Sequence, residues 1–188
     1  MAIPRDEMMR LVGLFCTVLL LVGACDSKGG SMSSSKNEQF TELAKRPDIE
    51  QINGEYERML EQIRDQLVAE IGITAWVPDE NPRRASLCGA EFNDVGGDGE
   101  VRLYSSGHSP GNLPDAKWAD ALKLVESIVG QHGFKLHGAV VDRPGDHEVT
   151  FGNDWGAELL FGTAKNTTLS ITTGCHLTQE AHQRGTPK

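Results

Sequence analysis

The segment after Pro47 carries apolar residues at spacings of three and four, with charged residues between them. This is the pattern of a helix that buries one face and exposes the other. Asp48 is a suitable N-cap for this helix and Gly72 a suitable stop. The apolar stripe is too short for a coiled-coil seam, so it predicts a helix that packs on a sheet. The stripe consists of Tyr56, Met59, Leu60, Ile63, Leu67 and Ile71.

Two further helices are expected, one on each side of this segment in the sequence. A short helix before Pro47 would bury Phe40 and Leu43, and the proline would end it. A longer helix is predicted over residues 115–131, with Trp118 on its apolar face and Pro114 at its start.

The rest of the chain is typical of strands joined by turns. Short turns between the last strands imply an antiparallel meander. With helices on one face, that gives an α+β fold: a two-layer sandwich in which an antiparallel sheet packs against two main helices. Residues 37–178 form this single domain, with loops at 93–100 and 105–114 and a disordered tail at 179–188. Strands are expected at residues 73–77, 101–105, 134–141, 148–151, 157–162 and 168–173.

The charge balance argues against nucleic acid as a partner. The 188 residues include 18 Lys and Arg against 27 Asp and Glu, a formal net charge of −9. Phosphate contacts need clustered Lys and Arg, and the sequence has no basic run.

Residues 1–24 have the organisation of a secretory signal peptide. Arg5 and Arg10 precede an apolar run over residues 11–24, shorter than the roughly 20 residues that a membrane-spanning helix needs. The run ends in LVGAC (residues 21–25), which resembles the lipobox of bacterial lipoproteins. This predicts cleavage before Cys25, acylation of the Cys25 sulfur with a palmitate-type chain, and attachment to the lipid bilayer on the extracytoplasmic face of the cell membrane. Ordinary secretion is the alternative, and residues 25–36 are expected to be a flexible tether.

Four cysteines then leave two for the folded domain. Cys16 is lost with the signal and Cys25 is used for lipid, so Cys88 and Cys175 remain in a compartment that allows oxidation. A structural Cys88–Cys175 disulfide is the interpretation that leaves no unpaired thiol. A redox or metal-binding pair is the alternative, but the sequence has no CxxC and no zinc-type spacing.

The motifs of common enzymes and cofactor sites do not occur in the sequence, so no catalytic residue, cofactor or metal is predicted. Two local clusters bring polar side chains together. Asp142, Asp146, His147 and Glu148 crowd one turn, which is too short for a calcium loop and is interpreted as a hairpin tip. His108-Ser109 is a hydroxyl–imidazole neighbour, interpreted as chance because a triad is defined in space.

One turn offers a candidate binding surface. Trp155 follows Asp154, and an exposed tryptophan there would be a contact for a lipid, a glycan or a protein. Packing of Trp155 over the hairpin is the other interpretation.

Several segments occur in an order that resembles the LppA-type lipoproteins of mycobacteria. They are the lipobox, YERMLEQIRDQLVAEI leading into TAWVPDENP, ASLCG, DALKLVESIVGQHGF and AELLFGTAKNTTLSITTGCHL, and they cover most of residues 50–178. The resemblance implies a membrane-anchored envelope protein with no established activity. Only Cys25, Cys88 and Cys175 carry over as functional positions.

Three functions are therefore weighed. The leading hypothesis is a non-catalytic envelope lipoprotein that binds a ligand or a protein partner. The second is a hydrolase of wall or lipid substrates that uses Asp154 and Glu158 or a histidine. The third is a structural or antigenic surface protein.

Overall fold

A computed structural model of the protein describes residues 35–188. The expected signal peptide, Cys25 and residues 25–34 of the expected tether lie outside the described residues. Ser35 and Lys36, which were also assigned to the tether, begin the first helix instead.

Two helices with strong N-caps open the described chain. Helix α1 (Lys36–Leu43) starts with a capping box between Ser35 and Glu38, and helix α2 (Ile49–Gln66) starts with one between Asp48 and Gln51. The α2 helix continues into a π-helical turn (Leu67–Ile71) and ends at Gly72, which adopts a left-handed conformation. Helix boundaries in this half of the chain follow the sequence prediction.

A seven-stranded antiparallel sheet forms the other layer. Its strand order is β1-β2-β6-β5-β4-β3, and β7 pairs with β2. The strands β3 to β6 form the predicted meander, because each one pairs antiparallel with the next in the sequence. The strands are β1 (Arg83–Leu87), β2 (Gly99–Pro110), β3 (Lys135–Arg143), β4 (Asp146–Gly152), β5 (Glu158–Thr163), β6 (Asn166–Thr172) and β7 (His176–Leu177).

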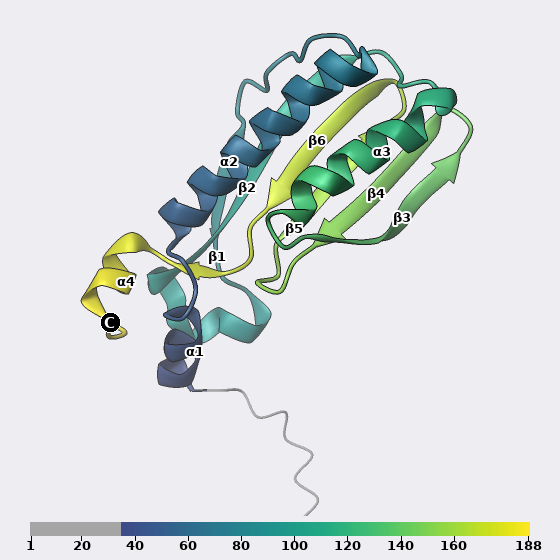
Figure 1. Ribbon diagram of the computed structural model, residues 1–188. Coiled ribbons are helices and arrows are strands. Elements are labelled where there is room, and N and C mark those ends of the chain that lie inside the picture. The colour runs from purple at the N-terminus through teal and green to yellow at the C-terminus, as the bar shows by residue number, and fades with distance from the viewer. Residues whose placement is uncertain (1–34) are drawn as a thin grey trace, which may run out of the picture. The chain divides into compact units, whose positions relative to one another are not determined.

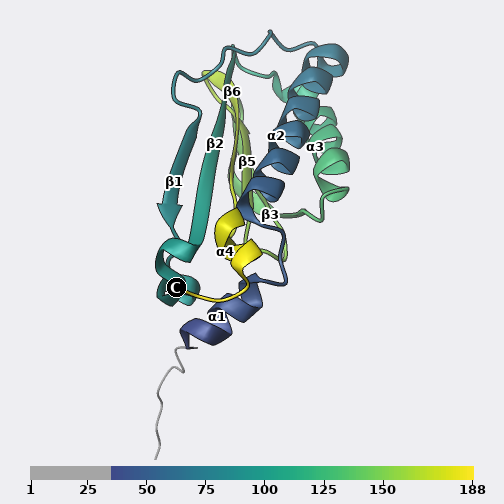
Figure 2. The ribbon, with the colours of Figure 1, turned by 90° about the vertical axis from the view of Figure 1, so that its left-hand side faces the viewer.

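Helices α2 and α3 (Asp115–Gly130) cover one face of the sheet. Figure 1 shows them running along the direction of the strands, and Figure 2 shows both on the same side of the sheet. The main core lies between the layers, where Tyr56 and Ile63 of α2 meet Phe151, Leu159 and Phe161 of the sheet. The predicted α+β two-layer sandwich with two main helices is confirmed.

A second, smaller core lies at the other end of β2. It is built around a disulfide between Cys88 and Cys175, whose Cα atoms are 5.5 Å apart. This is the pairing that the cysteine count favours. The buried residues of this core are Phe40, Leu43, Cys88, Phe92, Val95, Cys175, Leu177 and Ala181.

The region between α2 and α3 differs from the prediction. Residues 73–77 are not a strand, because only Val77 bridges to the sheet, through His108. The missed strand β1 is fully exposed and has no alternating pattern to reveal it. Residues 105–110, expected as a loop, extend β2 across a β-bulge. Most of the expected loop at 93–100 lies in a 3-10 helical segment (Ala90–Asp98).

The C-terminal residues are ordered, contrary to the predicted disordered tail. Helix α4 (Gln179–Arg184) is capped by Thr178 and buries Ala181. The buried Asp98 carboxylate accepts hydrogen bonds from Arg184 Nη2 at 2.7 Å and from the Lys188 backbone N–H at 2.8 Å. Burial raises the pKa of Asp98, but these donors outweigh it and hold the pKa below its ordinary value. A buried carboxylate that needs partners therefore fixes the tail.

Candidate functional site

The loop between β4 and β5 carries Trp155 and Asp154, the two residues of the predicted binding surface. Asn153 organises it: its side-chain oxygen accepts hydrogen bonds from the N–H groups of Trp155 and Ala157, each at 3.1 Å. Its side-chain nitrogen donates to the Tyr56 hydroxyl at 2.7 Å. Burial raises the pKa of Tyr56 to about 12, so the phenol stays neutral and able to take part in this bond. The loop is thereby fastened to α2.

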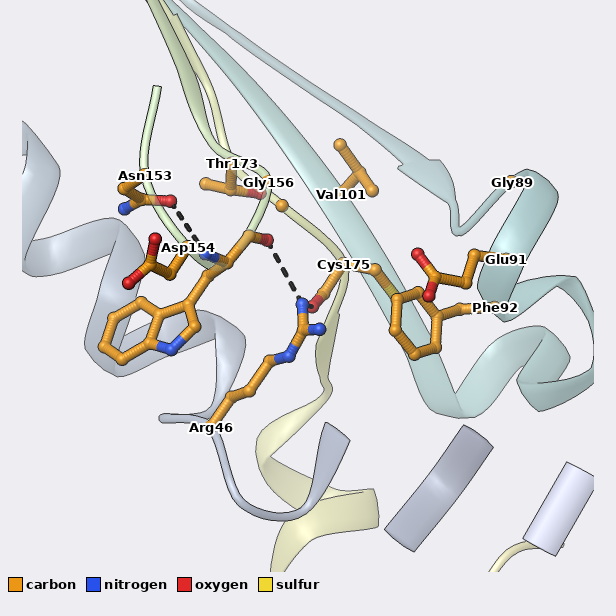
Figure 3. A pocket seen from close by; sticks show the side chains of 12 residues that line it. Arg46, Gly89, Glu91, Phe92, Val101, Asn153, Asp154, Gly156, Thr173 and Cys175 are labelled. Atoms are coloured by element: carbon orange, nitrogen blue, oxygen red, sulfur yellow. Dashed lines mark hydrogen bonds between the residues drawn. The ribbon is translucent and has the colours of Figure 1, made fainter. Parts of the chain in front are cut away.

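Arg46 fixes the same loop from below. It lies between α1 and α2, and its Nη1 donates to the carbonyl oxygens of Trp155 (3.1 Å) and Cys175 (3.2 Å). Its guanidinium lies 4.8 Å from the centre of the Phe92 ring, a cation–π contact. Figure 3 shows Arg46 between Asn153 and Asp154 on one side and Phe92 and Glu91 on the other. No local motif marks Arg46 in the sequence, because the two carbonyl groups that accept its hydrogen bonds are more than 100 residues away.

Gly174 allows the loop to approach the disulfide strand closely. A Cβ atom at Gly174 would lie 1.7 Å from the Trp155 carbonyl oxygen, so any larger residue would displace the loop. The Trp155 ring meets the ring of His176 edge-on at 5.9 Å. Trp155 itself is half-buried and Asp154 is exposed. Trp155 packs on the domain and keeps part of its surface exposed, so its role as a binding contact stays a prediction.

Two depressions adjoin this loop. The larger has a volume of about 470 Å³ and is lined by Arg46, Glu91, Phe92, Asp154 and Trp155, with Cys175 in its wall. The smaller, of about 230 Å³, is lined by His132, Gly133 and the same Asn153, Asp154 and Trp155. We call the two together the Trp155 groove. Charges of both signs and two aromatic rings therefore surround one fixed loop.

His132, which lines the smaller depression, is paired with a carboxylate that is not among the lining residues, and the sequence did not reveal this contact. His132 Nδ1 lies 2.7 Å from Glu55 Oε1. His132 lies in the turn after α3 and Glu55 lies in α2, 77 positions apart, so local spacing gives no signal. Glu158, proposed with Asp154 for a hydrolase, begins β5 opposite Gly152 and Thr172 and is not among the lining residues.

The other sequence clusters have structural partners. His147 is buried, with Nδ1 2.9 Å from Asp142 and Nε2 3.1 Å from Asp115, and its ring stacks on Trp118. Asp146 pairs with Arg143. Within residues 35–188, no group of three or more His, Cys, Asp and Glu side chains is arranged to hold a metal ion.

Ser109 is also engaged within the fold. Its hydroxyl donates to the Thr74 carbonyl oxygen at 2.5 Å, so it is not paired with its neighbour His108. Within the described part of the chain, no helix is long and apolar enough to cross a bilayer.

Comparison with known proteins identifies the family. The family model named LppA, described as a lipoprotein confined to pathogenic Mycobacterium, matches residues 26–179. The chain belongs to the LppA family. It is also similar to the crystal structure of LppA from Mycobacterium tuberculosis, with a TM-score of 0.53 and 14% identity over 77% of this chain and 87% of that chain. At this identity the likeness shows the fold. No curated protein matches the sequence significantly.

Proposed function

We propose that this protein is a lipid-anchored envelope lipoprotein that binds a saccharide in the Trp155 groove without transforming it. The observation that carries the proposal is the placement of Trp155, a half-exposed aromatic ring fixed between two depressions that share it. Rigid aromatic side chains supply contact area at low entropic cost.

The chemistry around Trp155 suits a polyhydroxylated ligand. The Trp155 ring, which is half-buried, offers an apolar face for the C–H face of a sugar. The carboxylates of Asp154 and Glu91 accept hydrogen bonds from hydroxyl groups, and the Arg46 guanidinium donates them. The groove is open, and a chain of sugars crossing Trp155 would occupy both depressions.

Binding is tested with the full-length protein in detergent and a glycan fraction purified from mycobacterial cell walls. Trp155→Ala is expected to weaken binding at least tenfold, because it removes the shared ring. Leu87→Ala is the matched control, since Leu87 is exposed and lies outside the groove. Equal glycan binding by the Trp155→Ala variant and the wild type would refute the proposal.

The anchor is part of the proposal. Membership of a lipoprotein family supports acylation at Cys25, which lies at the end of the lipobox-like run. Acylation would hold the domain at the extracytoplasmic face of the cell membrane. Labelling with palmitate is expected to mark the wild type, and Cys25→Ala is expected to abolish both the label and membrane retention. Unchanged retention of the variant would contradict the anchor.

A second candidate is supported by His132, which lines the smaller depression and contacts the Glu55 carboxylate behind it. A histidine oriented by a carboxylate is able to remove a proton from water, which is the first step of many hydrolyses. On this hypothesis the groove cleaves the glycan that it binds. The release of new reducing ends from the glycan, lost in a His132→Gln variant that still binds it, would favour the hydrolase over the binding module.

A further inference from the structure

Strand β2 is interrupted by a β-bulge between Ser105 and His108. Gly107 lies in the bulge with φ +79°, and a Cβ atom there would lie 2.0 Å from the Val77 carbonyl oxygen. Val77 and His108 exchange backbone hydrogen bonds of 2.7 and 3.0 Å. The bulge therefore holds the segment after α2 close to the sheet. Bulges often redirect a side chain next to a functional site.

A cavity of about 320 Å³ lies beside this bulge. Its polar lining comes from Arg64 of α2, Trp76 and Asp79 of the following segment, and Tyr104 and Ser106 of β2. Pro78 and Pro82 add apolar surface. We call this cavity the bulge pocket; none of its lining residues lines the Trp155 groove.

Two buried polar groups of this pocket have no hydrogen-bond partner within residues 35–188. They are the Ser106 hydroxyl and the Trp76 indole N–H. Ser106 is only 4% exposed. Buried polar groups are nearly always paired, so each exception asks for an explanation. Three residues further along β2, the buried Ser109 hydroxyl does find a partner in Thr74.

The pocket also contains a cation without a partner. Within the described chain, no hydrogen bond or ion pair involves the guanidinium of Arg64, whereas neighbouring Arg83 forms a two-point pair with Glu57 at 2.7 and 2.8 Å. The acidic group of the pocket, Asp79, is already engaged. Its pKa is lowered, first by the hydrogen bond from the Asn81 N–H and then by one from Ser105. The groups without a partner are therefore the Arg64 guanidinium, the Trp76 indole N–H and the Ser106 hydroxyl, and they lie beside the ionised Asp79, whose oxygens already accept hydrogen bonds.

We propose that the bulge pocket binds the carboxylate of a small organic acid. Indole N–H and guanidinium groups only donate hydrogen bonds, and a hydroxyl can donate, so an anionic oxygen ligand would satisfy all three. The two prolines and the Tyr104 ring provide an apolar wall for the organic part of the ligand. A volume of about 320 Å³ suits a molecule of small-metabolite size.

The test uses full-length protein labelled with ¹⁵N at tryptophan and held in detergent, with hexanoate as the probe. The sequence has three tryptophans. Trp76 lines the bulge pocket and Trp155 lines the Trp155 groove. Hexanoate is expected to shift the Trp76 indole N–H signal saturably and to leave the Trp155 signal unchanged. A Trp76→Phe variant assigns the signal.

Two comparisons decide the outcome. Arg64→Gln is expected to weaken hexanoate binding at least tenfold, whereas Arg58→Gln, an exposed change on the same helix, is expected to leave it unchanged. Hexan-1-ol, which has the same chain without the charge, is expected not to bind. Equal binding of the alcohol, or full binding by Arg64→Gln, would overturn the proposal. Failure here leaves the saccharide proposal untouched, because the two sites share no residue.

Discussion

The Trp155 groove and the bulge pocket satisfy their polar groups in opposite ways. In the groove, the Arg46 guanidinium and the Asn153 amide bond to backbone groups and to Tyr56, so the chain itself fixes the surface. In the bulge pocket, the Ser106 hydroxyl and the Trp76 N–H remain without partners in the described chain. The groove is thus held by hydrogen bonds within the chain. The pocket, in contrast, has hydrogen-bond donors that a bound ligand would satisfy.

The two regions also share a device. Each depends on a glycine where two backbone segments come too close for a side chain, Gly174 beside the Trp155 carbonyl and Gly107 beside the Val77 carbonyl. Rigidity at both sites therefore comes from backbone packing. Changes aimed at one region should therefore leave the other intact.

The largest effect is expected from removing the disulfide at the groove end. The bond links cysteines 87 positions apart, and a crosslink of that length stabilises a fold by about 4–5 kcal/mol through the unfolded chain. The Cys88→Ser/Cys175→Ser double variant is expected to lose roughly that much unfolding free energy, measured by denaturant titration under oxidising conditions. Reduced wild type is the control, because it should lose the same amount.

The same variant tests the independence of the two regions. Cys175 supplies a wall of the groove and a carbonyl that binds Arg46, so glycan binding should weaken. Hexanoate should still shift the Trp76 signal, since no residue that lines the bulge pocket lines the groove. Loss of both activities together, under conditions in which the protein is folded, would show that the regions are coupled.

The two glycines give a matched pair of smaller changes. Gly107→Ala is expected to cost about 2–4 kcal/mol, because it adds a left-handed alanine to a steric clash. Gly174→Ala adds only the clash and is expected to cost about 1–3 kcal/mol. Denaturant unfolding measures both. The first should move the Trp76 indole signal and the second the Trp155 signal; crossed effects would contradict the separation.

The sequence predicted the elements that bury an apolar face. The stripe from Tyr56 to Leu67, the helix at 115–131 and the meander were all visible, because their periodicities follow from burial against one another. The same logic missed β1, because this strand is exposed along its whole length. It also predicted too short a strand β2, because the bulge breaks the alternation of residues.

The sites depend on contacts between distant residues, and local patterns do not encode these. Trp155 stood out as a tryptophan in a turn, but Arg46, which holds its backbone, is 109 positions away in the sequence. The pair of His132 and Glu55 and the grouping of Arg64 with Ser106 come from separate helices and strands. The tail was misjudged because its order depends on the buried Asp98.

Acidification should weaken the groove end through His176. Its Nδ1 faces the Pro47 carbonyl at 2.8 Å and so carries the proton, while Nε2 is buried without a partner in the described chain. Burial lowers the pKa of His176 from 6.5. Below about pH 6.5, His176 is therefore protonated in the unfolded chain while it is still neutral in the folded protein. The unfolding free energy should fall from that pH down to the folded-state pKa and be insensitive to this group at higher pH.

Denaturant titrations at a series of pH values check this slope. A His176→Gln variant is expected to be less stable overall but to lose the part of the slope that His176 contributes. His108→Gln, a change on the other side of the domain, serves as the control and should keep it. An identical slope in the wild type and the His176→Gln variant would show that the imidazole does not titrate in this window.

The smallest effect on stability is expected at Ser106, and it separates a site from a defect. An unpaired buried hydroxyl destabilises a fold, so Ser106→Ala should leave the unfolding free energy unchanged or raise it by up to about 1 kcal/mol. The same change removes a donor from the bulge pocket and should weaken hexanoate binding several-fold.

Ser109→Ala is the matched control: it removes a hydroxyl that is bonded to Thr74, so it should destabilise the fold without affecting hexanoate binding. If the Ser106→Ala protein is stabilised and binds hexanoate as well as the wild type, the unpaired hydroxyl does not bond to the ligand. A stabilised protein with weakened binding would mean that the chain keeps a less stable pocket in order to hold a carboxylate.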